Sequence, residues 1–342
     1  MLRIDNLKLP VGVKEDKLRA ACAHVLRVSE EALVSVKLLR RSIDAREGVK
    51  LVCSAAVEVK NESGVLKRCK NKNVQPYAPK KYTPPAPVSA PEVSPVVIGA
   101  GPAGLFCALL LARCGARPIL LERGRAVEQR KRDVEHFWRT GELDLTSNVQ
   151  FGEGGAGAFS DGKYNITNDF GGTLHEYIGK KQALDLMHYV DEINMAYGGE
   201  GTKLYSTAGT KFKKLCIQNK LNLLDASVRH LGTDVNLVVL SNLYDLLKDK
   251  VDFYFDSPVT TISREGDGYR VTVGETDYTC DKCIVSVGRV GSKWMEGVCQ
   301  ELKIPTKSNR VDIGVRVEIP AVVFSHLTDE LYESKIVYKT EK

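Results

Sequence analysis

The sequence predicts an α/β fold in which a parallel sheet with covering helices is preceded by a separate, smaller α+β domain. Three observations predict it. An apolar strand, a glycine-rich turn, an apolar helix and a second strand follow one another from residue 95 to 124. Residues 251–288 alternate between apolar and polar, like a run of strands. Residues 1–68 show a β-α-β-β pattern of their own.

The composition favours a protein of the reducing cytoplasm. The 342 residues carry a formal net charge of +6, which suits small anions and requires neither nucleic acid nor a membrane surface as a partner. No apolar run approaches the roughly 20 residues that a membrane-spanning helix needs, and the N-terminus lacks the apolar core of a signal peptide. The nine cysteines are odd in number and show no disulfide-framework spacing, so we predict cytoplasmic localisation.

Residues 1–75 are predicted to form the small α+β domain. The alternating and helical patterns predict a strand at 2–9, a helix at 14–28, and two further strands at 33–43 and 49–59. No catalytic constellation is visible in this part of the sequence. We interpret it as a docking or scaffold domain.

Residues 76–94 are predicted to form an extended linker, because seven of the chain's 13 prolines fall within it or directly after it. A basic run without acids extends from Lys67 to Lys81. A nucleic-acid-binding arm is the alternative interpretation of this run. Only Tyr77 and Tyr82 could stack on bases, so we do not expect a nucleic-acid partner.

The strand-turn-helix run is a dinucleotide-binding fingerprint. Gly99 allows the tight turn, Gly101 lets the backbone approach a pyrophosphate, and Gly104 lets the helix pack closely on the strand. The helix begins at Pro102, and its free N–H groups would face the diphosphate. The second strand ends at Glu122, whose carboxylate suits ribose hydroxyls and would repel a 2′-phosphate. The fingerprint alone does not distinguish NAD from FAD. The neighbours expected to share this site are Ala100, Ala103 and Arg123.

A second glycine-rich stretch, FGEGGAGAFSDGK at 151–163, has the fingerprint spacing but not its context. No apolar strand precedes it, and no amphipathic helix follows it. Five glycines within 11 positions indicate a loop whose backbone lies close to something flat or charged. A flexible surface loop is the alternative. The residues of this loop expected to bind the cofactor are Gly154, Gly155 and Ser160.

Longer motifs add a resemblance to a known family. The run from Glu122 to Lys163, with VRHLGTD at 228–234, VSVGRVGSKW at 285–294 and VDIGVRVE at 311–318, resembles the uncharacterised FAD-dependent dehydrogenases. These proteins are also described as NAD(FAD)-utilising dehydrogenases, within the flavoproteins that have two dinucleotide-binding domains. The resemblance covers nearly the whole chain.

The resemblance implies a domain organisation. A glutathione-reductase-like FAD-binding Rossmann domain is expected from 95–165 and 255–310, with a helical and mixed insertion at 166–254 on the substrate side. Residues 311–342 would begin a C-terminal segment that continues further in the relatives.

The resemblance also implies contacts with the flavin. The loop at 151–163 is expected to lie against the ring, where backbone N–H groups would stabilise negative charge on the reduced flavin. Val259 lies where such flavoproteins contact adenine, and a plain sheet strand is the alternative. Gly288 resembles the glycine that ends a strand returning to the FAD domain. Arg130 could approach the diphosphate, and a solvated face of its charged helix is the alternative.

Candidates for proton or electron transfer are few. His230 and Lys163 are the candidate catalytic residues, and for His230 a structural role is the alternative. Cys280 and Cys283 form a CxxC pair that could relay electrons from the flavin, although Cys283 would also suit the core. No second cysteine pair and no histidine pair has the spacing of metal ligands, so no metal site is predicted.

We therefore expect an FAD-dependent oxidoreductase with a non-covalently bound flavin and an unidentified small-molecule substrate. Only one true fingerprint is present, so NAD(P)H, the candidate transient electron donor, would bind without a Rossmann domain of its own. Otherwise, the substrate itself would reduce the flavin. The alternatives are a non-redox FAD-binding protein whose N-terminal domain recruits a partner or RNA, and an NAD-binding domain without flavin. The glycine-rich loop argues against the last of these.

Overall fold

A computed structural model describes residues 1–10, 15–46, 48–78, 82–87, 89–208, 210–308 and 311–340. The chain divides into two compact units, Met1–Lys80 and Lys81–Lys342. Each unit is described by itself. In the described residues, no helix is long and apolar enough to cross a membrane.

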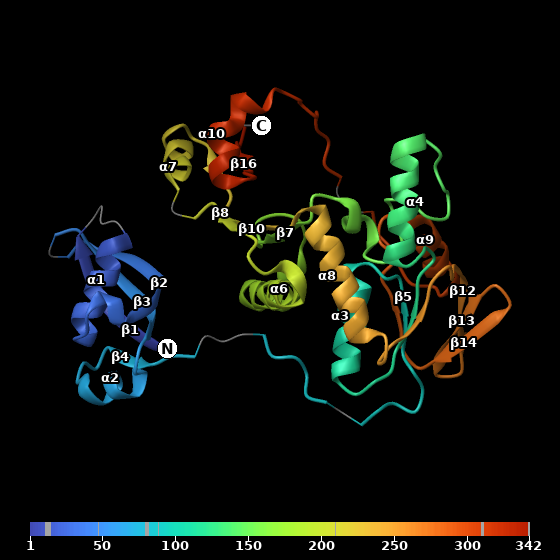
Figure 1. Cartoon of the computed structure of the whole chain (residues 1–342), viewed down its shortest axis with the longest axis horizontal. Helices are drawn as coiled ribbons and strands as arrows, with labels where there is room; N and C mark the ends of the chain where they lie inside the picture. Colours follow the sequence, from blue (N-terminus) through green and yellow to red (C-terminus); the bar gives the residue numbers. More distant parts are fainter. Residues whose placement is uncertain are drawn as a thin grey trace. The chain divides into compact units, whose positions relative to one another are not determined.

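The first unit is a β-α-β-β-α-β domain with one antiparallel sheet in the order β2-β3-β1-β4 (Figure 1). The strands and the first helix predicted for this region are present, and their apolar faces form a separate core. The elements are β1 (Leu2–Pro10), α1 (Glu15–Leu26), the 3₁₀ turn η1 (Glu30–Ala32), β2 (Leu33–Asp44), β3 (Lys50–Val59), α2 (Glu62–Arg68) and β4 (Val74–Pro76).

Helix α2 and strand β4 were not predicted from the sequence. Helix α2 is capped by Asn61, whose side chain accepts a hydrogen bond from the N–H of Gly64. It buries only Val65, so its apolar periodicity is too weak to predict a helix. The basic run therefore begins inside a helix rather than in a linker. Lys80 and Lys81 of that run lie outside the described residues.

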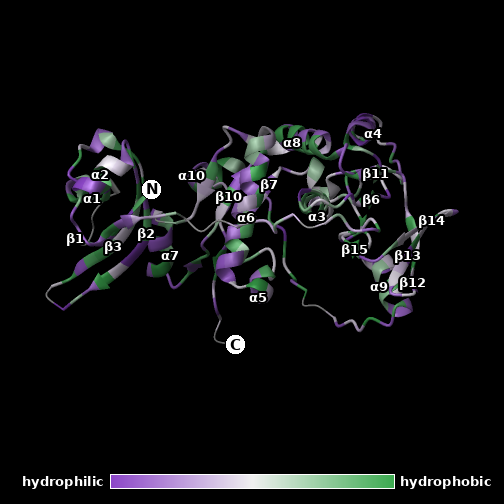
Figure 2. Cartoon of the chain, turned by 90° about the horizontal axis from the view of Figure 1, so that it is seen from below, coloured by the Kyte–Doolittle hydropathy of each residue, from purple (hydrophilic) through white to green (hydrophobic). Residues whose placement is uncertain are grey.

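The second unit is built on a parallel sheet in the order β11-β6-β5-β15. Helices α3 and α8 pack on it, and both are drawn largely in green, as hydrophobic, in Figure 2. Their apolar side chains and those of the sheet form one continuous core. The elements are β5 (Val96–Ile98), α3 (Pro102–Arg113), β6 (Ile119–Leu121), α8 (Gly232–Leu247), β11 (Asp252–Tyr254) and β15 (Cys283–Val285).

The boundary expected between insertion and sheet domain, near residue 255, differs from the structure. Strand β11 pairs in parallel with β6, and Leu240 and Leu243 of α8 lie in the same core as Leu105 of α3. The second part of the sheet domain therefore begins near Gly232, because non-local strand pairing brings α8 and β11 into its layers.

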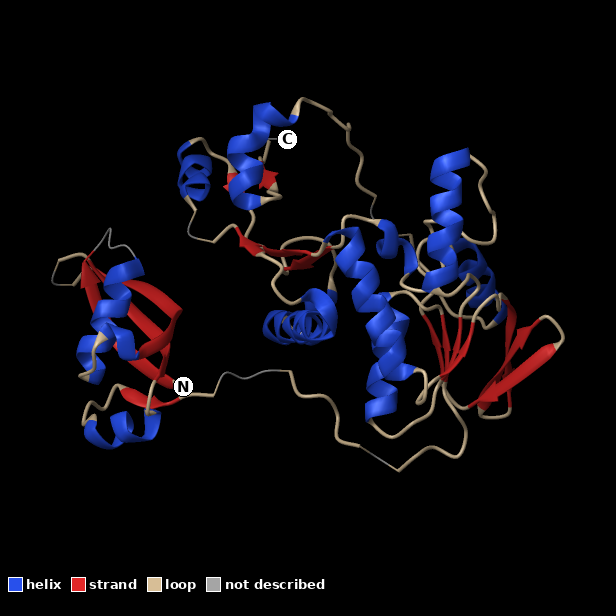
Figure 3. Ribbon diagram, in the orientation of Figure 1, coloured by secondary structure: helices blue, strands red, loops and turns tan. Residues whose placement is uncertain are grey.

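Helix α4, helix α9 and a three-stranded meander adjoin this sheet (Figure 3). Helix α4 follows β6. The strands β12, β13 and β14 form an antiparallel meander, which packs with α9 against the parallel sheet in a second apolar cluster. These elements are α4 (Val127–Thr140), β12 (Val259–Glu265), β13 (Gly268–Val273), β14 (Thr276–Cys280) and α9 (Ser292–Glu301).

The insertion is mixed, with a small antiparallel sheet in the order β7-β10-β8. Strand β16 pairs antiparallel with β9 in a separate two-stranded sheet. The elements are η2 (Gly155–Phe159), β7 (Lys163–Ile166), α5 (Leu174–Ile178), α6 (Lys180–Asn194), the π turn η3 (Met195–Gly199), β8 (Leu204–Ser206), α7 (Lys211–Gln218), β9 (Asn222–Leu223), β10 (Ser227–His230), α10 (Ala321–Leu331) and β16 (Ile336–Val337).

Candidate cofactor-binding site

A cavity of about 980 Å³ lies at the carboxyl edge of the parallel sheet. Its walls come from the turn between β5 and α3, from the residues after β6, and from the loops that follow β11 and β15. One side is closed by residues 149–152 and 155–156, which belong to the first part of the glycine-rich stretch and to the two residues before it. Ligands of open α/β sheets bind at this edge.

A side chain at each of the three fingerprint glycines would have a different structural effect. A Cβ on Gly99, whose φ is +101°, would lie 2.6 Å from the carbonyl oxygen of Ser286. A Cβ on Gly104 would lie 1.8 Å from the carbonyl oxygen of Gly99. Gly101 differs from both, because its φ of −70° suits any residue and its Cβ would meet nothing nearer than the Cα of Gly155 at 3.9 Å. The fold itself requires the first two glycines, whereas Gly101 leaves space in the cavity.

Glu122 joins three backbone segments at the floor of the cavity. Its Oε2 accepts a hydrogen bond from the N–H of Ala100 at 2.7 Å, and its Oε1 accepts one from Gly124 at 2.9 Å. The N–H of Gly152 also donates to Oε1, at 3.2 Å. The carboxylate is 5% exposed and lines the cavity, so it binds the surrounding turns together beside the predicted ribose position.

The glycine-rich stretch packs directly against the fingerprint turn. The N–H of Gly154 donates to the carbonyl of Ala100 at 2.8 Å, and Gly152, Gly154 and Gly155 all have positive φ. Gly152 and Gly155 line the cavity. Gly154 faces α8 instead, where a Cβ would lie 2.4 Å from a methyl group of Leu240. The backbone of this stretch is therefore fixed by packing, and it is not a loose surface loop.

Arg130 fixes the backbone of this stretch through buried hydrogen bonds. The alternative interpretation, a solvated helix face, is wrong for Arg130, because this residue is 0% exposed. Its Nε donates to the carbonyl of Asn148 at 2.8 Å, and its Nη1 donates to the carbonyls of Glu153 at 2.7 Å and Gly155 at 2.8 Å. Burial lowers the pKa of its guanidinium to about 10. Arg130 does not line the cavity, so the structure gives it a positioning role.

Replacing Arg130 with methionine should destabilise the second unit by about 3 kcal/mol, because three buried carbonyls would lose their donor. Lysine should not rescue it, since an ammonium lacks the planar fork that reaches several acceptors. Urea unfolding followed by tryptophan fluorescence measures this unit alone, because Trp138 and Trp294 are the chain's only tryptophans. Replacing the exposed Arg132 on the same helix with methionine is the control and should change stability by less than about 0.5 kcal/mol. Equal effects of the two substitutions would contradict the positioning role.

Glu153 is a second buried charge beside Arg130. It is 1% exposed, and its Oε2 accepts a hydrogen bond from the N–H of Val127 at the start of α4, at 2.8 Å. Its Oε1 is buried without a hydrogen-bond partner. Burial raises the pKa of the Glu153 carboxyl to about 7. A buried group that titrates near neutrality therefore lies inside the glycine-rich stretch.

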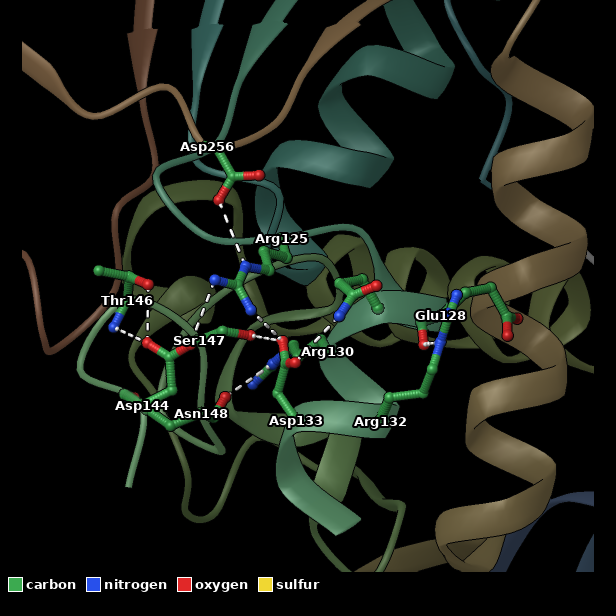
Figure 4. A network of polar contacts seen from close by, with 11 residues as sticks. Arg125, Glu128, Arg130, Arg132, Asp133, Asp144, Thr146, Ser147, Asn148 and Asp256 are labelled. Atoms are coloured by element: carbon green, nitrogen blue, oxygen red, sulfur yellow. Dashed lines mark hydrogen bonds and ion pairs between the residues drawn. The ribbon is translucent and has the colours of Figure 1, made fainter. Parts of the chain in front are cut away.

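Arg125 connects the turn after β6 with three further segments, which are α4, the loop after α4 and the residues after β11 (Figure 4). Its guanidinium lies 2.8 Å from Asp133 of α4, 3.2 Å from Asp144 and 3.7 Å from Asp256 after β11. Its backbone carbonyl accepts a hydrogen bond from the N–H of Glu153 at 3.1 Å. Hydrogen bonds from Thr146 lower the pKa of Asp144 below its ordinary value. This network fixes the outer wall of the site, whereas a single exposed ion pair would contribute little.

Comparisons with known proteins decide the family. A family model described as FAD dependent oxidoreductase matches residues 95–320, more than half of the chain. The chain belongs to the FAD-dependent oxidoreductase family. A model described as a domain of unknown function matches residues 1–60 of the chain. FAD is the cofactor of the family, and the expectation of FAD from the fingerprint and the longer motifs is confirmed.

Over the matched residues, the individual relatives are between 13% and 31% identical to this chain. An uncharacterised protein of Clostridium beijerinckii is 31% identical over 326 residues, which cover 93% of this chain and 54% of the relative. The chain thus spans about half the length of the curated relative that it matches. Glycine oxidase from Geobacillus kaustophilus is 13% identical with a TM-score of 0.37, over 61% of this chain and 58% of the enzyme. Thioredoxin reductase from Lactococcus lactis is 15% identical with a TM-score of 0.26, over 58% and 36%.

The residues of the cavity fit FAD. Its volume of about 980 Å³ lies at the upper end of the range for cofactor sites, and the N-terminus of α3 opens into it. The space beside Gly101 is not filled by protein atoms. Most of the fingerprint residues expected to bind FAD line this cavity, as do three later residues. They are Gly99, Gly101, Pro102, Ala103, Glu122, Arg123, Gly155, Val259 and Gly288.

A few of the expected contacts lie elsewhere. Ala100 is buried behind the turn and offers its N–H to Glu122. Gly104 lies in the packing between helix and strand. Ser160 lines a second, smaller cavity. Sequence reasoning missed Ser257, Pro258 and Ser286, which line the main cavity and carry no local signal beyond following a strand.

Both candidate catalytic residues contact the two residues that directly follow α10. The His230 ring lies 4.2 Å from the ring of Tyr332, centroid to centroid. Lys163 forms an ion pair with Glu333 at 2.5 Å. Neither residue lines the main cavity, and Lys163 lines the second one. The structure therefore groups them with the insertion and α10 instead of with the fingerprint.

The CxxC pair lies at the opposite edge of the sheet from the cavity. Cys283 pairs with Val96 at the amino end of β5, whereas the cavity begins at Ile98. Cys280 is buried, and both cysteines pack in the core between the sheet and α9. A hydrogen bond with Cys280 raises the pKa of the Cys283 thiol. The same hydrogen bond lowers the pKa of the Cys280 thiol, so the position of the pair is the stronger argument: it suits a core role and lies away from the cavity.

Proposed function

We propose that the protein oxidises a small-molecule substrate with a non-covalently bound FAD held in the main cavity. The observation that carries this proposal is the free space at Gly101, which is unused by the fold and lies at the N-terminus of α3. A helix N-terminus with free N–H groups favours a diphosphate at that point. When bound, the flavin accepts two electrons from an organic substrate.

The residues around the cavity would have separate tasks. Glu122 would accept a hydrogen bond from a ribose hydroxyl with an oxygen lone pair not used by the backbone. The adenine would lie near Val259. The backbone of Gly155 and Ala156, where the wall continues towards the insertion, would face the flavin end. Arg130 and Arg125 do not touch the cofactor in this proposal, and they hold its walls in place.

The electron donor is part of the proposal. A single fingerprint supports FAD, and no second one is present in the sequence for a nicotinamide cofactor. NADH or NADPH would therefore bind transiently beside the flavin, or the substrate would reduce it directly.

The test is an absorbance spectrum followed by anaerobic titration. The protein is incubated with FAD, freed of excess cofactor, and titrated without oxygen with NADH, NADPH and a panel of small alcohols and amines. We expect a retained flavin band that one of these compounds bleaches. A protein that retains no FAD would contradict the assignment of the cavity. Retained FAD that none of the compounds reduces would contradict the oxidoreductase activity and favour a non-redox role for the flavin.

A further inference from the structure

A second cavity of about 440 Å³ adjoins the first. Pro102 lines both cavities, and η2 contributes Gly155 and Ala156 to the first and Gly157 to the second. The second cavity is therefore placed where η2 leads away from the fingerprint. Its remaining walls come from β7 and the residues just before it, from the loop that precedes α5, and from one residue each of α5 and α6.

Two glycines leave space in this cavity that the fold does not use. A Cβ on Gly157 or on Gly172 would meet no atom within 4 Å, and neither residue has a left-handed backbone. Their small size is thus required neither by backbone conformation nor by protein neighbours. Both glycines are exposed, so this side of the cavity is open to an occupant from outside the chain.

One buried polar atom in the wall has no partner. Asn165 of β7 lines the cavity, and its Oδ1 is buried without a hydrogen bond. An amide carries an acceptor and two donors, and a half-turn exchanges them. Because a buried polar group without a partner costs stability, Asn165 is suited to a ligand that carries a single hydroxyl or amide.

The charges around the cavity cancel. Lys163 is the only cation among the described residues that line it, and Glu333 neutralises it at 2.5 Å. Lys335 lies 4.1 Å over the ring of Phe170 at the rim and 3.8 Å from the same Glu333. The described residues that line the cavity include no carboxylate. With Lys163 already paired, the lining offers no free counter-charge to an ionised ligand, and burying an unpaired charge is costly.

We propose that this second cavity is the substrate pocket, and that it selects a small uncharged molecule with one hydroxyl or amide group on an apolar skeleton. Asn165 would bind the polar group. Phe170, Leu174 and Met187 supply the apolar wall. The substrate role rests on the proposed function, whereas the selection for an uncharged ligand rests on this cavity alone.

The test uses three probes with one carbon skeleton: 3-methylbutan-1-ol, 3-methylbutanoate and 3-methylbutan-1-amine. Saturation-transfer NMR with the whole chain, with and without FAD, measures the binding of each probe. We expect the alcohol to bind at least about tenfold more tightly than either charged probe, and Asn165→Leu to weaken it about tenfold. Gly157→Leu, which fills the cavity without removing a polar group, should also abolish binding. Asn222→Leu, an exposed asparagine on β9, is the matched control and should bind as the wild type does.

The outcomes separate this inference from the proposed function. An alcohol that does not bind, a charged probe that binds as well as the alcohol, or binding unchanged in both Asn165→Leu and Gly157→Leu would overturn the pocket. Selective binding of the alcohol by a protein that retains no FAD would overturn the proposed function and leave the pocket intact.

Discussion

Replacing Gly101 with alanine should abolish or strongly weaken FAD binding while the second unit stays folded. The added methyl group would lie 3.9 Å from the nearest protein atom, the Cα of Gly155, so we expect the free energy of unfolding to change by less than about 1 kcal/mol. The same methyl group would occupy the space where a diphosphate approaches the backbone. Equilibrium titration with FAD should show at least a hundredfold loss of affinity, and tryptophan fluorescence in urea should report the stability.

Gly104→Ala is the matched control for this experiment. Its Cβ would lie 1.8 Å from the carbonyl oxygen of Gly99, so helix α3 must move away from β5. We expect a loss of about 2 kcal/mol or more in the free energy of unfolding. If Gly101→Ala retained normal FAD affinity, the assignment of the cavity would be wrong. If Gly104→Ala were as stable as the wild type, the close approach of helix and strand would be wrong.

Glu153→Gln should remove a pH dependence of stability. The folded-state pKa of Glu153 is raised to about 7 from an ordinary 4.5 by burial. A raised carboxyl pKa means that the folded state binds the proton more tightly than the unfolded state does. Its contribution to stability is therefore complete below about pH 4.5 and is lost as the pH rises through about 7. Over that interval the loss is about 3 kcal/mol.

The measurement compares urea unfolding of wild type and Glu153→Gln from pH 5 to pH 8.5. Glutamine keeps an acceptor for the N–H of Val127 and carries no charge, so the variant should gain on the wild type as the pH rises. The groups that act on Glu153 are Glu128, Arg130 and Glu122, and Glu128→Gln on the exposed side of α4 serves as the control. Parallel curves for wild type and Glu153→Gln would show that burial does not raise the pKa of Glu153 in the folded protein.

The fold around the fingerprint could be predicted because its signal is local. The positions of Gly99, Gly101 and Gly104 relative to an apolar strand and helix are all contained in some 30 residues. The membership of α8 and β11 in the same layers could not be predicted in this way. It depends on pairing of Asp252–Tyr254 with Ile119–Leu121 across more than a hundred residues of chain.

The sequence does contain a signal for the burial of Arg130. Val127, Arg130 and Val134 are the buried residues of α4, and they lie at the i, i+3, i+7 spacing of one helix face. The many charges of that helix hid the stripe. Glu153 had no comparable signal, because an acid among glycines is typical of a solvated loop, and only the surrounding fold removes it from water.

Arg130 donates hydrogen bonds to the carbonyls of Asn148, Glu153 and Gly155. These bonds should affect the rate at which the protein binds its cofactor. A glycine-rich loop that becomes ordered only on binding loses about 1–2 kcal/mol of backbone entropy per residue at that moment, and its folding slows association. Here the loop is already ordered by a side chain of its own domain, so the cofactor meets a preformed surface. FAD association should then be governed by diffusion and docking, with a heat-capacity change that reflects only the surface buried by the cofactor.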